Sequence, residues 1–276
     1  MMYKEIEFEI RDGIAVIRLN RPDKKNALSP ALNREVLAAM EEIESDSTLR
    51  GIMLTGSGDS FSAGLDLNAS FLNTMEQSDS REFRNVMEPV LKWYRKLYES
   101  PLPTIAVVNG HCYGGGVNPV SICDVAVASD RAQFALSEIN FAHFPAGGST
   151  WSATAFLLPK HAYWLCLSGE RITAQEAFRM GLITRVVPHD ELENTAWEMI
   201  TLLASKHPAA YKTAKKMCRM TPHMQLWEAT ELEMAHIHEN YFLSEGEMTK
   251  VALQQFKNKT LRPGAGQTYS NSAAQT

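Results

Sequence analysis

Short apolar runs that end in turns of glycine and other small residues constrain this chain more than any other feature. The run Thr104–Val108 is almost entirely apolar, so a strand formed there has to be covered on both faces. It ends at Asn109-Gly110, and a triple-glycine turn follows at 114–116 before a further helical pattern. Because strands alternate with helical segments along the chain, we expect an α/β fold with substantial parallel pairing.

The first fifty residues carry clear local signals. Apolar and acidic residues alternate over 6–10, Asp12-Gly13 is a hairpin turn, and 14–19 returns as a second strand. Ser29 is a suitable N-cap with Pro30 at the first helical position, which predicts a helix over 30–46. The remaining pattern predicts a strand at 52–54, a loop over 56–64, helices over 80–99, 151–168, 174–181, 190–206, 208–220 and 225–243, and strands at 124–128, 133–136 and 183–187.

The last part of the chain differs in character, because helical patterns dominate after about residue 150. This helix-rich region is either a second small domain or an oligomer interface. In the pattern over 225–243 we expect core contacts from Trp227, Leu232, Ile237 and Tyr241. The tail from Arg262 is rich in Gly, Ser, Gln and Ala and is expected to fray.

Composition excludes several classes of protein. With 45% apolar residues and a net charge of −5 over 276 residues, the chain is not intrinsically disordered. No window holds about 18 consecutive apolar residues, so a membrane span is not expected. The mildly acidic balance disfavours a nucleic-acid partner. No apolar leader is visible and no metal-ligand spacing occurs, so we expect a cytoplasmic protein without a metal, whose thiols are free: Cys112, Cys123, Cys166 and Cys218.

Three segments carry groups suited to chemistry, at 60–67, 109–116 and 134–140. A glycine turn at a helix N-terminus leaves backbone N–H groups free to face an anion, and two such donors form an oxyanion hole. Glu138 follows an apolar strand, where a low-dielectric pocket suits a general acid or base. The structural alternatives are a tight-packing role for the glycines, a surface position for Glu138 and a local cap role for Asp66.

The ordered combination of motifs resembles the crotonase, or enoyl-CoA hydratase/isomerase, superfamily. The motifs are N-R-P-x-x-x-N-A-L at 20–28, F-S-A-G-L-D-L at 61–67, N-G-x-x-x-G-G-G at 109–116, C-D at 123–124, F-x-L-S-E at 134–138, and R-I-T-A-Q-E-A-x-x-M-G-L-I-x-x-V-V at 171–187. The resemblance implies a spiral of ββα turns followed by a helical region that builds homotrimers or dimers of trimers. We expect a spiral core over 1–205, a C-terminal helical region over 206–262 and a flexible tail over 263–276.

The resemblance also implies a substrate and a site. The substrate is an acyl-CoA thioester, with coenzyme A entering only as part of it and no separate cofactor. The backbone N–H groups of Leu65 and Gly115 are expected to hold the thioester oxygen and stabilise an enolate. Further substrate contacts are expected from a set that includes two loop lysines, for which solvated loop charges are an equal alternative: Lys24, Lys25, Ala63, Tyr113 and Phe144.

The reaction depends on how many carboxylates the site holds. Hydratases of this superfamily carry two glutamates; here Asn118 stands at the first position and Glu138 at the second. Asparagine cannot exchange a proton, although it can orient a water molecule or the substrate. One carboxylate therefore has to carry the acid–base chemistry.

Within the superfamily the chain resembles the 4-hydroxycinnamoyl-CoA (feruloyl-CoA) hydratase-lyases, which also rely on one Glu. The matching stretches are 20–35, 137–140 and 255–264. The stretch Trp227–Ala235 lacks the tyrosines with which those enzymes recognise a phenol, and Phe144 departs from their pattern, so we expect an altered acyl pocket. We predict hydration of an aryl-substituted enoyl-CoA, with retro-aldol cleavage to an aldehyde and acetyl-CoA as a further step. The alternatives are a Δ3-Δ2 enoyl-CoA isomerase and a non-catalytic acyl-CoA or RNA-binding relative.

Overall fold

The computed structural model describes residues 3–72, 80–240, 246–262, 264 and 266. Contacts within the chain divide it into two compact units, Met1–Thr201 and Leu202–Thr276. The boundaries expected at residues 205 and 262 remain predictions. Among the described helices, none combines the length and the apolar character that crossing a membrane requires.

The predicted N-terminal hairpin is present. Strands β1 (Ile6–Arg11) and β2 (Ile14–Leu19) pair antiparallel from Ile6 opposite Leu19 to Arg11 opposite Ile14. The turn residues Asp12 and Gly13 both have positive φ, at 50° and 76°. Two successive positive φ values are what a two-residue type I′ hairpin turn requires, so the Asp-Gly signal accounts for the geometry.

A six-stranded sheet continues from this hairpin in the order β1-β2-β3-β5-β7-β10. Every pairing after the hairpin is parallel. All residues of β3 and β5 are buried, as expected for parallel strands that are covered on both faces. The strands from the third onward are β3 (Gly51–Gly56), β5 (Thr104–Val108), β7 (Val125–Ser129) and β10 (Arg185–Val187).

A second, four-stranded sheet runs in the order β4-β6-β8-β9. Its members are β4 (Ser60–Ser62), β6 (His111–Tyr113), β8 (Gln133–Ala135) and β9 (Ile172–Thr173). The first three are parallel, and β9 is antiparallel to β8. The chain alternates between the sheets, because β3 and β4, β5 and β6, and β7 and β8 are successive pairs, each followed by helical segments. This is the predicted mixed α/β spiral of ββα turns.

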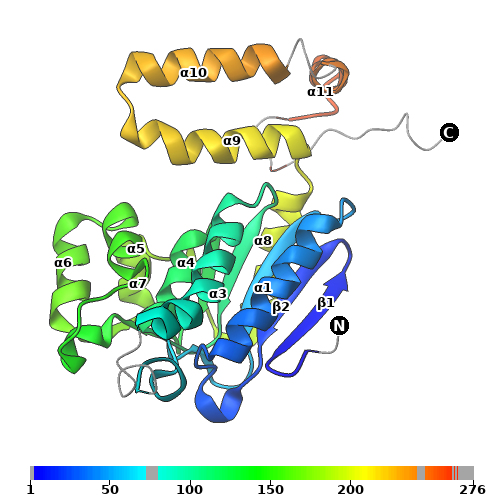
Figure 1. Cartoon of the computed structure of the whole chain (residues 1–276). Coiled ribbons are helices and arrows are strands. Elements are labelled where there is room, and N and C mark those ends of the chain that lie inside the picture. Colours follow the sequence, from blue (N-terminus) through cyan, green and yellow to red (C-terminus); the bar gives the residue numbers. More distant parts are fainter. Residues whose placement is uncertain (1–2, 73–79, 241–245, 263, 265, 267–276) are drawn as a thin grey trace. The chain divides into compact units, whose positions relative to one another are not determined.

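Two helices lie side by side against the larger sheet, α1 (Pro30–Ser45) and α3 (Ser80–Glu99) (Figure 1). Ser29 caps α1 as predicted, since its Oγ accepts from the N–H of Leu32 at 3.0 Å. The fully buried Trp93 of α3 donates its indole N–H to Oδ1 of Asn33 at 3.0 Å. This bond satisfies two polar groups that would otherwise be costly to bury between the helices.

The helix predicted over 151–168 is two helices, α5 (Ser149–Phe156) and α6 (Pro159–Ser168). The prediction of one continuous element was wrong at Leu157 and Leu158, which are extended, with ψ near 150°. The cause is Pro159, which has no N–H for a continuing helix and disfavours helical geometry in the residue before it. The other helices of this part of the chain are α4 (Val117–Ile122), α7 (Ala174–Met180) and α8 (Leu192–Ala204).

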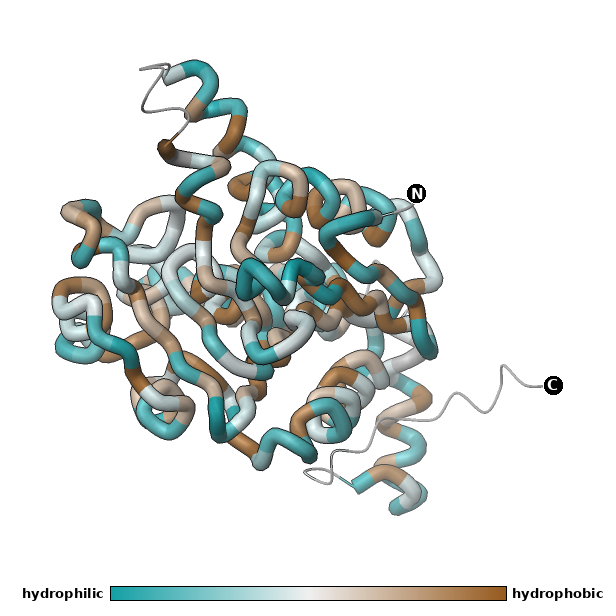
Figure 2. Tube along the Cα trace, turned by 90° about the horizontal axis from the view of Figure 1, so that it is seen from below, coloured by the Kyte–Doolittle hydropathy of each residue, from teal (hydrophilic) through white to brown (hydrophobic). Residues whose placement is uncertain are grey.

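The second unit contains α9 (Pro208–Met220), α10 (Leu226–His238) and α11 (Glu247–Lys257). The prediction of core contacts along α10 was wrong for Trp227 and Ile237, whose exposed fractions are 75% and 47%. Residues 241–243 of the predicted helix, including Tyr241, lie outside the described residues. Figure 2 shows hydrophobic and hydrophilic residues mixed along the helical coils of the chain. An apolar pattern in the sequence predicts an apolar helix face, but it does not by itself show that this face is buried within the chain.

Candidate active site

The three segments singled out in the sequence meet at one edge of the smaller sheet. Strands β4, β6 and β8 are neighbours and run in the same direction. Directly after them come Ala63–Leu65, Gly114–Gly116 and Leu136–Glu138, respectively. Because the carboxyl ends of parallel strands lie at the same edge of a sheet, these segments are brought together, and this edge is where ligands bind in open α/β sheets.

The first segment is a turn held by the loop before α1. The N–H of Leu28 donates to the Gly64 carbonyl at 2.8 Å, and the N–H of Asp66 donates to the Leu28 carbonyl at 3.2 Å. These two bonds form a single parallel bridge between Leu28 and Leu65. In such a bridge the bonded groups belong to the residues on either side of Leu65. The N–H of Leu65 is therefore directed away from residue 28.

The second segment approaches the first so closely that only glycine fits. Gly64 has a φ of +87°, and a Cβ built on it would lie 2.7 Å from the Tyr113 carbonyl oxygen and 3.2 Å from the Gly115 nitrogen. A Cβ built on Gly115 would lie 3.8 Å from the Leu65 nitrogen. The nitrogens of Leu65 and Gly115 thus border one small space. Two backbone donors in this arrangement are suited to binding an oxyanion.

The third segment brings a carboxyl group to the same space. Glu138 lies on the 3-10 turn η4 (Ser137–Phe141), and a Cβ built on Gly114 would lie 3.3 Å from its Oε1. Its Oε2 is buried and has no hydrogen-bond partner among the described residues. Burial raises the pKa of Glu138, and this effect outweighs an opposing interaction with its own backbone and the charge of His143. A carboxyl group of raised pKa beside two oxyanion donors is suited to proton transfer.

The Glu138 turn is anchored to α6. Nδ2 of Asn140 donates to the Gly169 carbonyl at 3.1 Å, at the C-terminus of that helix. On the other side of the turn, the N–H of His143 donates to the Glu138 carbonyl at 3.2 Å. Both bonds restrict the backbone that carries the carboxylate, which limits the positions the side chain can take.

Asn118 lies on α4 and is almost completely buried. Its Nδ2 donates to the Gly147 carbonyl at 3.0 Å, and its Oδ1 accepts from Oγ of Ser152 at 3.2 Å. The amide therefore ties α4 to α5 and to the turn before it. Its predicted role in orienting water or substrate remains a prediction.

The two loop lysines are linked to the site through the backbone. The carbonyl of Lys25 accepts from the N–H of Ala63 at 2.8 Å, next to the Leu65 turn. Lys24 closes the short turn η1 (Pro22–Lys24), and both lysines are exposed. Their contact with the CoA phosphates remains a prediction.

Tyr113 and Phe144 flank the site in different ways. The Tyr113 hydroxyl donates to Oε1 of Gln133 at 3.1 Å and lies 3.0 Å from Nδ1 of His111. Both partners are on strands of the smaller sheet, so the Tyr113 side chain lies along that sheet. It is the Tyr113 carbonyl that faces the Leu65 turn. Phe144 follows the Glu138 segment, stacks on His143 and is 65% exposed.

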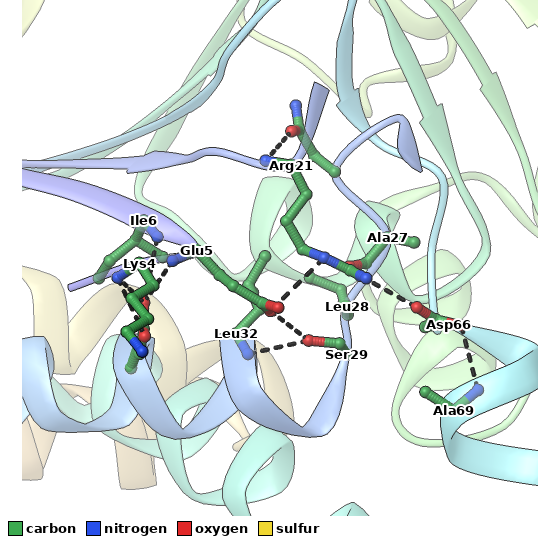
Figure 3. A network of polar contacts seen from close by, with 12 residues as sticks. Lys4, Glu5, Ile6, Arg21, Ala27, Leu28, Ser29, Leu32, Asp66 and Ala69 are labelled. Carbon is green, nitrogen blue, oxygen red and sulfur yellow. Dashed lines mark hydrogen bonds and ion pairs between the residues drawn. The ribbon is translucent and has the colours of Figure 1, made fainter. Parts of the chain in front are cut away.

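A polar network around Arg21 holds Asp66, the residue that follows Leu65 (Figure 3). Arg21 donates to the Ala27 carbonyl at 2.6 Å and to Oδ2 of Asp66 at 3.0 Å, and it pairs with Glu5. Oδ1 of Asp66 accepts from the N–H of Ala69 at 3.1 Å, which confirms its role as a local cap. The N-R-P motif contained Arg21, but nothing in the sequence indicated that it would hold residue 66.

Sequence reasoning missed one buried polar residue next to the site. The Tyr94 hydroxyl of α3 donates to the Gly115 carbonyl at 2.6 Å. The sequence carries no signal for this contact, because Tyr94 occurs in an ordinary amphipathic helical pattern 21 residues before its partner.

Residues 9–262 match the family model described as enoyl-CoA hydratase/isomerase. The chain belongs to the crotonase family. This crotonase is 34% identical over 274 residues to a hydroxycinnamoyl-CoA hydratase-lyase from Pseudomonas fluorescens, covering 95% of each chain. It is also 34% identical over 217 residues to a short-chain-enoyl-CoA hydratase from Clostridium acetobutylicum, covering 78% of this chain and 81% of the relative.

The fold comparison agrees with the family assignment. The crystal structure of an enoyl-CoA hydratase from Mycobacterium smegmatis matches with a TM-score of 0.83 at 26% identity, over 93% of this crotonase and 97% of that chain. The protein is therefore an enzyme of the crotonase family, and the predicted superfamily and fold are confirmed.

The raised pKa of Glu138 predicts a pH-dependent cost to the stability of this crotonase. Since burial disfavours the ionised form, the folded protein holds this proton more tightly than the unfolded chain does, and stability falls as pH rises through the raised pKa. Glu138→Gln removes the buried charge, so we expect the variant to unfold at a higher urea concentration than the native enzyme at pH 7. The difference in midpoint should vanish below about pH 4, where Glu138 of the unsubstituted enzyme is protonated in both the folded and the unfolded form. An unchanged midpoint of urea unfolding at pH 7 would contradict the prediction that ionised Glu138 destabilises the folded enzyme.

Proposed function

We propose that this crotonase hydrates an α,β-unsaturated enoyl-CoA thioester. The observation that carries the proposal is the placement of Glu138, with its raised pKa, against the space bordered by the Leu65 and Gly115 nitrogens. The names of the relatives support the same reaction class, since they include hydratases and a hydratase-lyase.

In the proposed mechanism the two backbone N–H groups hold the thioester oxygen as negative charge develops on it. Ionised Glu138 takes a proton from water as the water oxygen bonds to the β-carbon, and the electrons of the double bond move toward the thioester. The result is an enolate whose oxygen lies in the hole. Glu138 then returns the proton to the α-carbon, so one carboxyl group completes the addition and is regenerated.

The finer proposal is an aryl-substituted substrate followed by retro-aldol cleavage. It is supported by the relative from Pseudomonas fluorescens, which is named a hydroxycinnamoyl-CoA hydratase-lyase. Removal of the β-hydroxyl proton would break the bond between the α- and β-carbons, which releases an aldehyde and the enolate of acetyl-CoA. That enolate takes up a proton at its α-carbon. In this step too, the two backbone N–H groups would hold the enolate oxygen, and Glu138 would take the hydroxyl proton and return a proton to the α-carbon.

The remaining site residues have supporting roles in the proposal. Lys24 and Lys25 would attract the CoA phosphates from their exposed loop, and Ala63, Tyr113 and Phe144 would line the substrate path around the three turns. Asn118 would orient water or substrate. Coenzyme A would enter only as part of the thioester, and the enzyme would work as a homotrimer or a dimer of trimers in the cytoplasm.

A Δ3-Δ2 enoyl-CoA isomerase is the second candidate, because a single carboxylate also suffices to move a proton between two carbons. Incubation with a panel of aliphatic and aryl 2-enoyl-CoA thioesters in ¹⁸O-labelled water separates the two. We expect mass spectrometry to find ¹⁸O in a β-hydroxy thioester or in a released aldehyde. Incorporation in neither product, together with conversion of a 3-enoyl-CoA to its 2-isomer, would overturn hydration in favour of isomerisation.

A further inference from the structure

The Tyr94 side chain contacts the glycine turn at Gly115. It lies on α3 with only 7% of its surface exposed, and its ring contacts Trp93 edge-on. Its hydroxyl donates to the Gly115 carbonyl at 2.6 Å and would lie 3.5 Å from a Cβ built on that glycine. The phenol oxygen is thus in direct contact with the residue whose nitrogen borders the candidate oxyanion site.

The Tyr94 hydroxyl is the last group in a line of polar contacts. Oγ of Ser152 donates to Oδ1 of Asn118 at 3.2 Å, and the Asn118 amide lies close enough to the Tyr94 hydroxyl to lower its pKa. Asn118 also donates to the Gly147 carbonyl at 3.0 Å. Ser152 of α5 and Asn118 of α4 are therefore linked to the Gly115 carbonyl through Tyr94 of α3, whose hydroxyl makes the contact. Connected polar groups of this kind restrict one another when their hydrogen bonds are satisfied.

The phenol keeps its proton and so remains a donor. Burial raises the pKa of Tyr94 far above its ordinary value; the Asn118 amide lowers it to a smaller extent, and the nearby Cys112 and Glu138 raise it further. Since the carbonyl of Gly115 can only accept, a protonated Tyr94 is the form that fits this contact.

We propose that Tyr94 is a positioning residue that fixes the peptide groups of Gly115 so that its N–H is aimed at the thioester oxygen. Glycine rotates about its backbone more freely than any other residue, and Gly115 has no side chain to restrict it. Because the N–H and the carbonyl of Gly115 are attached to the same Cα, a hydrogen bond that holds the carbonyl also limits the directions open to the N–H. This inference rests on the proposed function, since it assigns Gly115 a catalytic N–H.

Tyr94→Phe tests the proposal, because it removes the hydroxyl and keeps the ring. We expect kcat for hydration to fall by about 10- to 100-fold, since small misplacements of catalytic groups have effects of this order. We expect KM to stay within about threefold of the native value, because the thioester is bound along its whole length. Tyr3→Phe is the matched control, since its hydroxyl contacts Glu42 at the surface at 3.3 Å, and it should leave both constants unchanged.

A spectroscopic readout distinguishes positioning from a general loss of structure. Cinnamoyl-CoA absorbs at longer wavelength when its carbonyl oxygen is polarised. In a Glu138→Gln background, where the thioester is not turned over, we expect binding to shift its absorption to the red. Adding Tyr94→Phe should reduce that shift, whereas adding Tyr3→Phe should not.

An unchanged red shift or an unchanged kcat in the folded Tyr94→Phe variants would overturn the proposal. If Tyr94→Phe does not fold, Ser152→Ala takes its place, because it removes the donor to Asn118 two contacts away. A smaller fall in kcat and in the red shift is then expected, and no change in either would overturn the proposal. If the native enzyme turns over no enoyl-CoA and Glu138→Gln alone shows no shift, it is the proposed function that fails.

Discussion

Glu138→Gln is expected to lower kcat for enoyl-CoA hydration by about 10²- to 10⁴-fold, the range in which a positioned acid–base group contributes. Glutamine is similar in shape but cannot accept a proton from water or return one to carbon. Oε1 of Glu138 would lie 3.3 Å from a Cβ built on Gly114, whereas Asp66, the carboxylate next to Leu65, is held by Arg21 and by the N–H of Ala69. The measurement is steady-state hydration of the best substrate in the thioester panel.

Binding has to be measured in parallel with turnover. The thioester oxygen is held by backbone groups, so we expect Glu138→Gln to bind a CoA thioester with nearly native affinity in isothermal titration calorimetry. Glu41→Gln, an exposed change of the same chemistry on α1, is the control and should retain native activity. Native kcat in Glu138→Gln would refute the assignment, and loss of both binding and folding would show that the residue is structural.

Gly64→Ala is expected to lower kcat by about 10²- to 10³-fold, as loss of an oxyanion donor does in other enzymes. The added methyl group would lie 2.7 Å from the Tyr113 carbonyl oxygen and 3.2 Å from the Gly115 nitrogen, so the two turns have to separate. The positive φ of +87° adds backbone strain of about 1–3 kcal/mol. Chemical denaturation and steady-state kinetics on the same preparation give the stability and activity effects.

Gly181→Ala tests the effect of backbone strain alone, without the steric collision that Gly64→Ala introduces. Gly181 ends α7 with a φ of +89°, and a Cβ there would meet its nearest neighbour, the Phe156 carbonyl oxygen, at 3.7 Å. The backbone penalty is therefore similar, while the catalytic turns are not touched. We expect a smaller loss of stability than that of Gly64→Ala, which adds the collision to the strain, and near-native kcat. Equal losses of kcat in both variants would refute a specific role for the Gly64–Gly115 approach.

The larger sheet and its covering helices were predictable from the sequence, whereas in the smaller sheet β8 was predicted and β4, which lies in the predicted loop over 56–64, was not. The β1–β2 hairpin, the Ser29 cap of α1 and the buried strand Thr104–Val108 are encoded by alternation, capping chemistry and continuous apolar residues. Strands β4 and β6 have three residues each, which is too short for a periodic pattern. Their pairing depends on contacts between segments about fifty residues apart.

The site was predictable in its parts but not in its supports. Gly64, Gly115 and Glu138 lie in motifs whose order in the chain resembles the crotonase family, so the sequence alone indicates the three segments that form the site. Their supports could not, because Arg21–Asp66 and Tyr94–Gly115 join residues 45 and 21 positions apart through side chains of common types. Such contacts are set by the packing of the whole unit.

The parallel bridge at Leu65 has a consequence for mutational tolerance. The donor that this residue offers is a main-chain N–H, which every amino acid except proline possesses. Its direction is fixed by the bonds of Gly64 and Asp66 to Leu28, so a change of the side chain at position 65, which packs against the core, alters packing without deleting the donor. A saturation library should therefore accept most apolar residues at position 65 and reject proline there. At position 64, by contrast, selection for activity should return glycine almost alone.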